Sequence, residues 1–165
     1  MKLFVIRVND FDPDKWRALV PSNSGILCNE TKLREYQAGL RDKDRILLVG
    51  TVNQHTPSNV RGRMLALVSV HGGMHHTKDF IDEPYLSSGF IKDHKLGRIK
   101  KPYCLPYKEA VVFDKRLHRL QVIMDTIEPM KRSRDHRFQV HPDHVDGVIR
   151  HLDGLRSTVH SYALP

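Results

Sequence analysis

RILLVG at residues 45–50 and RMLALVSV at residues 63–70 are the clearest strand patterns in the chain. Both runs are short and almost continuously apolar, which predicts strands at central positions of a sheet or barrel. The polar segment 51–62 joins them and contains turn residues at Pro57 and Gly62. We therefore expect an antiparallel hairpin with a long tip.

Other elements follow on both sides of this hairpin. Apolar, β-branched stretches predict further strands at 3–8, 110–113 and 117–124. Capping residues and helical spacing of apolar residues predict helices at 12–20, at 29–40 and after Pro142. Consecutive strands with helices near the ends, and no regular βαβ alternation, predict an α+β domain built on a small antiparallel sheet or barrel.

Length and composition indicate one domain over residues 1–165, with 39% hydrophobic residues and no linker or repeat. Cys28 and Cys104 lie far apart without CxxC spacing, which favours two free thiols in a reducing compartment, the alternative being a disulfide between them. No apolar run reaches the length of a membrane span, and the N-terminus lacks a signal-peptide core. We expect a soluble, cytoplasmic protein that has no membrane partner.

The charge balance points to the partner. The chain carries 27 Lys and Arg against 19 Asp and Glu, a net charge of +8, and a pI of about 9.7. A basic protein of this kind is suited to a polyanion such as nucleic acid. The alternative is that the charge serves colloidal stability alone.

Four segments resemble the PUA-like superfamily, especially its EVE and YTH branches. They are residues 25–36, 44–50, 62–70 and 101–106, and the resemblance covers roughly residues 1–125 through the order and texture of the elements. It implies a small antiparallel β-barrel flanked by helices, with a pocket for a modified or flipped base and a basic rim. The YTH pattern places a cage tryptophan where this chain has Leu27, and Trp16 is the only tryptophan, so an EVE-like or divergent pocket is expected.

The implied pocket lies between the 23–29 loop, the 51–61 tip and the region of Tyr103. A base outside its stack needs an aromatic surface, groups for its edge and cations for its phosphates. The predicted base-pocket residues are Trp16, Asn23, Asn29, Asn53, Tyr85 and Tyr103. The predicted backbone-binding residues are Arg61, Arg98, Lys100 and Lys101.

The strongest indication is the alternation of aromatic and basic residues between Tyr85 and Tyr107, since stacking and phosphate contacts together suit splayed bases. Each candidate also has a structural alternative. Asn29 is a preferred N-cap for the next helix, the tip contains ordinary turn residues, and aromatic side chains commonly fill cores.

Histidines suggest a second function class. His71, His75 and His76 lie close together, and three more histidines occur near Asp143 and Asp146, which raises a small metal- or histidine-dependent nuclease as the alternative. Their spacing matches no zinc pattern, and GxSxG, GxxxxGK[ST] and GxGxxG are absent. We expect a binding module with no catalytic residue, metal or cofactor, with a separate effector nuclease as a candidate partner. A third interpretation is a subunit whose basic face meets an acidic protein.

Overall fold

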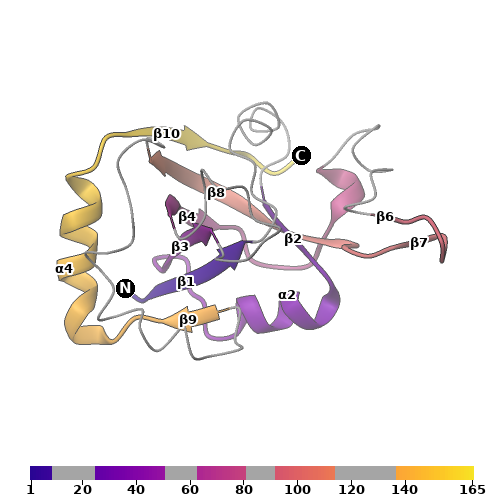
Figure 1. Cartoon of the computed structure of the whole chain (residues 1–165), viewed down its shortest axis with the longest axis horizontal. Coiled ribbons are helices and arrows are strands. Elements are labelled where there is room, and N and C mark those ends of the chain that lie inside the picture. Colours follow the sequence, from indigo (N-terminus) through magenta and orange to yellow (C-terminus); the bar gives the residue numbers. More distant parts are fainter. Residues whose placement is uncertain (9–24, 51–62, 81–91, 114–136) are drawn as a thin grey trace.

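The computed structural model describes residues 1–8, 25–50, 63–80, 92–113 and 137–165. These form an α+β fold in which a curled sheet makes half a barrel and carries two helices (Figure 1). The elements are β1 (Leu3–Val8), β2 (Gly25–Cys28), α2 (Glu30–Gln37), β3 (Arg45–Gly50), β4 (Met64–Val70), β5 (His75–His76), the 3₁₀ helix η1 (Thr77–Asp79), β6 (Lys92–Asp93), β7 (Arg98–Ile99), β8 (Tyr103–Phe113), β9 (Arg137–Gln139), α4 (Pro142–Asp153) and β10 (Ser157–Ser161).

The main sheet has the strand order β10-β8-β4-β3-β1-β9. β3 and β4 are antiparallel neighbours, with Ile46 opposite Val68, as predicted for the central hairpin. β1 instead runs parallel to β3, so the prediction of a purely antiparallel sheet is wrong at this pair. A parallel pair needs a long crossover, and here the connection between the two strands contains α2.

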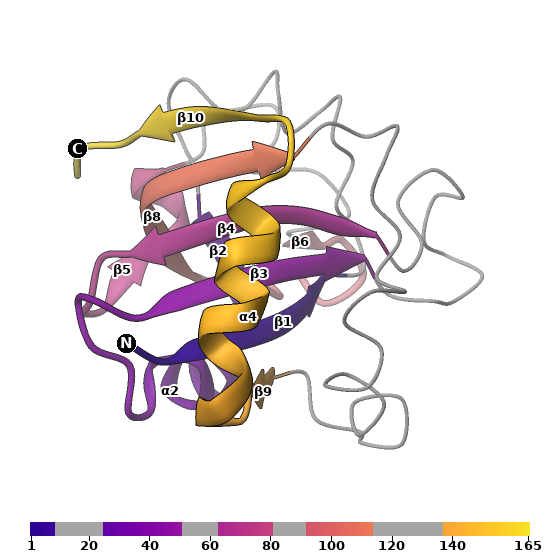
Figure 2. The same ribbon diagram turned by 90° about the vertical axis from the view of Figure 1, so that its left-hand side faces the viewer.

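Both faces of the central strands are buried. Phe4 and Ile6 of β1 face one core, which also contains Leu33 of α2, whereas Leu3 and Val5 face a second core beneath α4. Side chains alternate between the faces of a strand, so a continuous apolar run has to be covered on both sides. Figure 2 shows α4 lying across the strands on its side of the sheet.

Two β-bulges mark the curved region of the sheet. The register passes from Leu48↔Ala66 to Val49↔Met64, which leaves Leu65 as an extra residue in β4. A similar shift between β4 and β8 lies at Lys108, between the residues that face Ser69 and Val70. Bulges bend a strand and increase its twist, so these two positions favour curling of the sheet around the core that contains Leu33.

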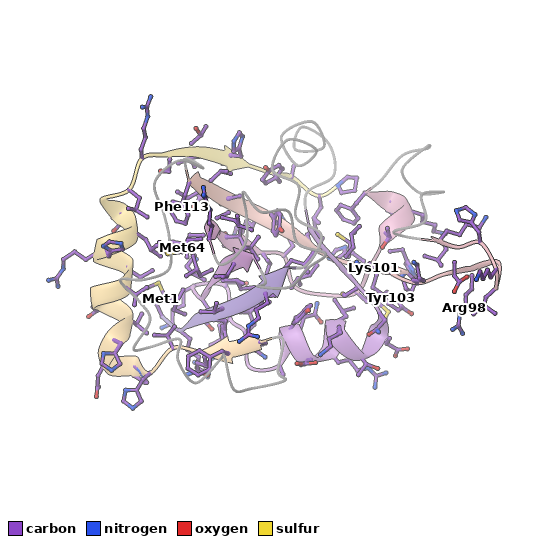
Figure 3. All side chains as sticks on the ribbon, viewed as in Figure 1. Met1, Met64, Arg98, Lys101, Tyr103 and Phe113 are labelled. Atoms are coloured by element: carbon purple, nitrogen blue, oxygen red, sulfur yellow. The ribbon has the colours of Figure 1, made fainter. Side chains whose placement is uncertain are left out.

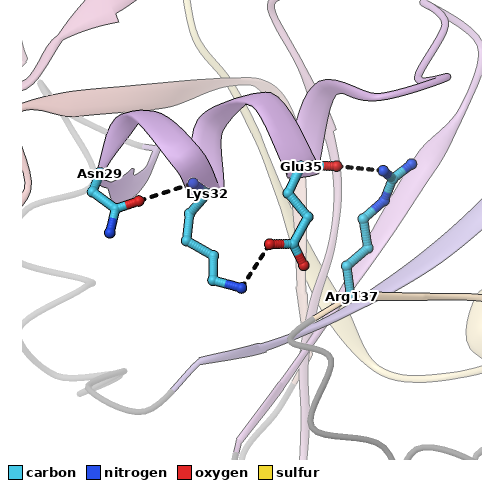
Figure 4. A network of polar contacts seen from close by, with 4 residues as sticks. All are labelled: Asn29, Lys32, Glu35 and Arg137. Atoms are coloured by element: carbon cyan, nitrogen blue, oxygen red, sulfur yellow. Dashed lines mark hydrogen bonds and ion pairs between the residues drawn. The ribbon is translucent and has the colours of Figure 1, made fainter.

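Both described helices confirm sequence predictions. α2 begins after Asn29, and α4 begins with Pro142 at its first position. At the other end of α2, the guanidinium of Arg137 donates to the main-chain oxygen of Glu35 at 2.5 Å (Figure 4) and to that of Ala38 at 2.7 Å. The Arg137 guanidinium carbon also lies 3.9 Å from the centre of the Phe4 ring. Arg137 therefore joins β9 to α2 and β1, a role that its place in a basic run of the sequence did not indicate.

Other predictions need correction. Residues 25–28 belong to the strand β2 and not to a loop, and the segment 101–106 already contains the start of β8. The last described element is the strand β10, not the helix. The predicted helix 12–20, the tip 51–62 and the strand 117–124 lie outside the described residues. Within the described ranges, no helix has the length and apolar character needed to cross a membrane.

Candidate functional site

The first half of β8 meets two short strands that lie on its opposite edges. Tyr103 pairs with Cys28 of β2 and also with His76 of β5. Residues directly opposite in antiparallel strands project from the same face, so these three side chains are neighbours. The ring centres of His76 and Tyr103 are 5.4 Å apart and the rings are tilted by 37°.

The two rings differ in burial. Tyr103 is half-buried and packs against the core beneath the curled sheet, whereas His76 is exposed. The pair therefore presents an aromatic surface that is supported from below and open on one side. We name His76 and Tyr103 the aromatic pair.

Asn29 directly follows Cys28, the residue of β2 that pairs with Tyr103. Its side-chain oxygen accepts a hydrogen bond from the main-chain nitrogen of Lys32 at 2.9 Å, which caps α2 (Figure 4). The N-cap alternative for Asn29 is thus confirmed. Because this oxygen serves the helix, reading of a base edge would have to use the amide nitrogen.

Thr77 anchors the segment that leads into Tyr103. Its side chain is fully buried, and its hydroxyl donates to the main-chain oxygen of Lys101 at 2.6 Å. The main-chain nitrogen of Thr77 donates to the oxygen of Pro102 at 2.9 Å. These bonds hold the start of β8 against η1 and so set the position of Tyr103 relative to His76.

A basic hairpin projects from this anchored segment. β6 and β7 pair antiparallel, with Lys92 opposite Ile99 and Asp93 opposite Arg98. Residues 94–100 are all exposed. Five cations belong to residues 92–101, which we name the basic hairpin: Lys92, Lys95, Arg98, Lys100 and Lys101. Figure 3 shows Arg98 near the far end of this hairpin, with Lys101 and Tyr103 toward its base.

Cys28 lies opposite Tyr103, and Cys104 follows Tyr103 in β8. Both thiols are free, as predicted, and both are buried. Burial raises the pKa of the Cys28 thiol to about 12, although the Lys101 ammonium acts to lower it. Burial and the neighbouring Cys28 raise the pKa of Cys104 to about 12 as well. Since a thiol must lose its proton to act as a nucleophile, neither cysteine is suited to covalent chemistry at neutral pH.

Three of the described histidines have structural roles. His71 and His75 contact the main-chain oxygens of Tyr162 and Gly72 through their Nε2 atoms, at 3.3 and 2.9 Å. His141 caps α4 and accepts from the nitrogen of Asp143 at 3.4 Å. Among the described residues, no group of three His, Cys, Asp or Glu side chains is arranged to hold a metal ion.

The structure unites part of the predicted site. Arg98, Lys100, Lys101 and Tyr103 form one continuous feature, whereas Trp16, Asn23, Asn53, Arg61 and Tyr85 lie outside the described residues. Sequence reasoning did not assign His76 or Thr77 to the site, because only the pairing of β5 with β8 brings them to Tyr103. No protein-family model matches the sequence, and no curated protein matches it.

Proposed function

We propose that this chain is a nucleic-acid-binding domain in which the basic hairpin contacts the backbone and the aromatic pair stacks on a base. The observation that carries the proposal is the direct passage from a run of exposed cations into Tyr103, which lies beside His76. Cations and a stacking surface in immediate succession are what an unstacked nucleotide requires.

Support from below favours Tyr103 as the stacking residue. Base stacking on an aromatic side chain contributes about 1–3 kcal/mol per base. A ring that is already packed against the core loses little further conformational freedom on binding. Since Tyr103 is half-buried and its strand is anchored through Thr77, most of that stacking energy remains available for binding.

The finer proposal is that the base is modified, by a methyl or hydroxymethyl group, and is flipped into a pocket beside the aromatic pair. It rests on the resemblance of four segments to the PUA-like superfamily and on the place of Tyr103 within the last of them. In this proposal the domain itself breaks no covalent bond, and a separate effector nuclease acts on what it binds.

The test is fluorescence-anisotropy binding to plain, methylated and hydroxymethylated oligonucleotides at two salt concentrations. Arg98→Gln should weaken binding to every sequence alike and reduce the slope of log K against log salt by about 0.9 on duplex DNA. Tyr103→Leu should lower affinity about 10-fold for the preferred base and remove the discrimination between modified and plain bases.

The matched control is Arg150→Gln, which removes an exposed cation from α4. It should leave binding unchanged, because the proposed contacts belong to the basic hairpin. An equal loss in the Arg150 and Arg98 variants would contradict a defined binding surface. Cleavage of labelled DNA or RNA in the presence of Mg²⁺, Mn²⁺ or Zn²⁺ would instead favour a nuclease.

A further inference from the structure

We infer that the basic hairpin enters the major groove of double-stranded DNA as a two-stranded ribbon, with Leu96 at its tip against the base edges. The inference rests on the proposed function and assigns a duplex form to its target. Four features of the hairpin support it: its exposure, its hydrogen-bonded turn, its positive charge and its apolar tip.

The hairpin stands out from the rest of the sheet. Its two strands pair with each other as a separate two-stranded sheet, and residues 94–100 are exposed. Figure 1 shows β6 and β7 extending beyond the body of the molecule. An isolated two-stranded hairpin buries too little to be stabilised by packing, so a surface of this shape is suited to contact with another molecule.

Local hydrogen bonds order the tip. The Asp93 carboxylate accepts from the main-chain nitrogens of Lys95 and Leu96, at 3.0 and 3.1 Å. Gly97 has a φ of +64°, a conformation that other residues rarely adopt. The turn is therefore shaped before binding, and the single acidic residue of the hairpin is engaged by the turn.

Charge and apolar surface are combined in an unusual way. Leu96 is 62% exposed and Ile99 is 42% exposed, both within a segment that carries five cations. Cations along a ribbon can reach the phosphates on both sides of a groove, while an apolar tip can contact the methyl groups of pyrimidines on its floor. A purely electrostatic contact would give Leu96 no partner.

Groove dimensions select the nucleic acid. The major groove of B-form DNA is about 12 Å wide and admits a two-stranded β-ribbon. The major groove of an RNA duplex is deep and narrow, and side chains cannot read it. Groove entry by this hairpin therefore requires DNA, and it would leave the aromatic pair at the root of the hairpin beside the duplex.

The experiment uses the full chain and three probes of one sequence: a 20-base-pair DNA duplex, the corresponding RNA duplex and single-stranded DNA. We expect the DNA duplex to bind at least about 10-fold more tightly than the RNA duplex. Leu96→Ser should weaken duplex DNA binding about 5-fold without changing the salt slope, since it removes apolar contact and no charge. Val159→Ser is the matched control, because Val159 is 60% exposed on β10, away from the hairpin.

Each result that differs from these expectations overturns a specific claim. Equal binding of the two duplexes, tighter binding of the single strand, or equal effects of the Leu96 and Val159 variants would overturn groove entry while leaving nucleic-acid binding intact. No binding to any of the three probes would overturn the proposed function itself. Vesicles of phosphatidylserine and phosphatidylcholine serve as a fourth probe, and binding to them alone would overturn both claims.

Discussion

The two halves of β8 differ in their surroundings and in their roles. The outer half, Tyr107–Phe113, lies between β4 and β10, and Ala110 and Phe113 there are buried. The inner half, Tyr103–Pro106, lies between the short strands β2 and β5 and leaves Tyr103 half-buried beside an exposed histidine. One strand thus supports the buried core at one end and carries the proposed binding surface at the other.

Pro106 lies where the two halves meet. It has no main-chain N–H, and its oxygen accepts from the nitrogen of His71 at 2.8 Å, just beyond the end of β4. Together with the bulge at Lys108, this allows β8 to exchange one set of neighbours for another. Substitutions in the two halves of β8 should therefore alter the stability of the domain and the proposed binding separately.

The largest expected effect separates the two ends of the strand. Phe113→Ala removes a buried ring at the outer end and should lower the free energy of unfolding by about 3–5 kcal/mol. Tyr103→Leu at the inner end should lower it by about 1 kcal/mol, because the half-buried ring is replaced by another apolar group. Urea denaturation of both variants checks this, and comparable losses would show that the inner half supports the buried core as well.

A smaller effect is expected where β2 docks on the inner half. A Cβ atom at Gly25 would lie 2.3 Å from the Cys104 sulfur and 2.7 Å from the Leu105 oxygen. Because one obstacle is main chain, Gly25→Ala should lower the free energy of unfolding by about 1–3 kcal/mol. Gly72→Ala is the control, since a Cβ there would meet nothing within 4 Å. If both variants unfold at the same urea concentration, β2 is not held closely against β8.

A further expected effect is a dependence on pH. Burial raises the pKa of Cys28 and of Cys104 from 9.0 to about 12. The folded chain keeps these protons where the unfolded chain loses them, so this contribution to stability is complete below pH 9 and is lost as the pH rises toward 12. Urea denaturation between pH 7.5 and 11 should show a decline above pH 9 that is weaker in a variant with both cysteines replaced by alanine. A decline of equal size in that variant would show that other groups cause it.

Several strands and both described helices could be predicted, because the sequence patterns that indicate them are local. Strands 3–8, 45–50 and 63–70 are apolar runs that require burial, and the two described helices carry capping residues and apolar residues at helical spacing. β10 could not be predicted, because its sequence STVHS contains one apolar residue, Val159, and that residue is exposed. Its strand conformation comes from pairing with β8.

Part of the candidate site could also be predicted, because that part depends on local residue types. The run of cations and Tyr103 are visible as residue types, and their order along the chain already suggested a nucleic-acid partner. His76 joins Tyr103 only through the register of β5 on β8, which depends on residues far apart in sequence. Asn29 was a candidate both for a helix cap and for reading a base edge, and its hydrogen bond to Lys32 shows that it caps α2.

The sequence by itself determined which segments must be buried, where the helices begin and where positive charge gathers, because hydrophobicity, capping and charge belong to individual residues and their near neighbours. The tertiary structure alone decided that β1 lies parallel to β3 and that β8 has two different pairs of neighbours. It also decided that the Arg137 side chain binds main-chain oxygens at the C-terminal end of α2. Those features depend on main-chain hydrogen bonds and contacts between distant segments. Such bonds have the same chemistry at almost every residue, so no single stretch of sequence specifies its partner.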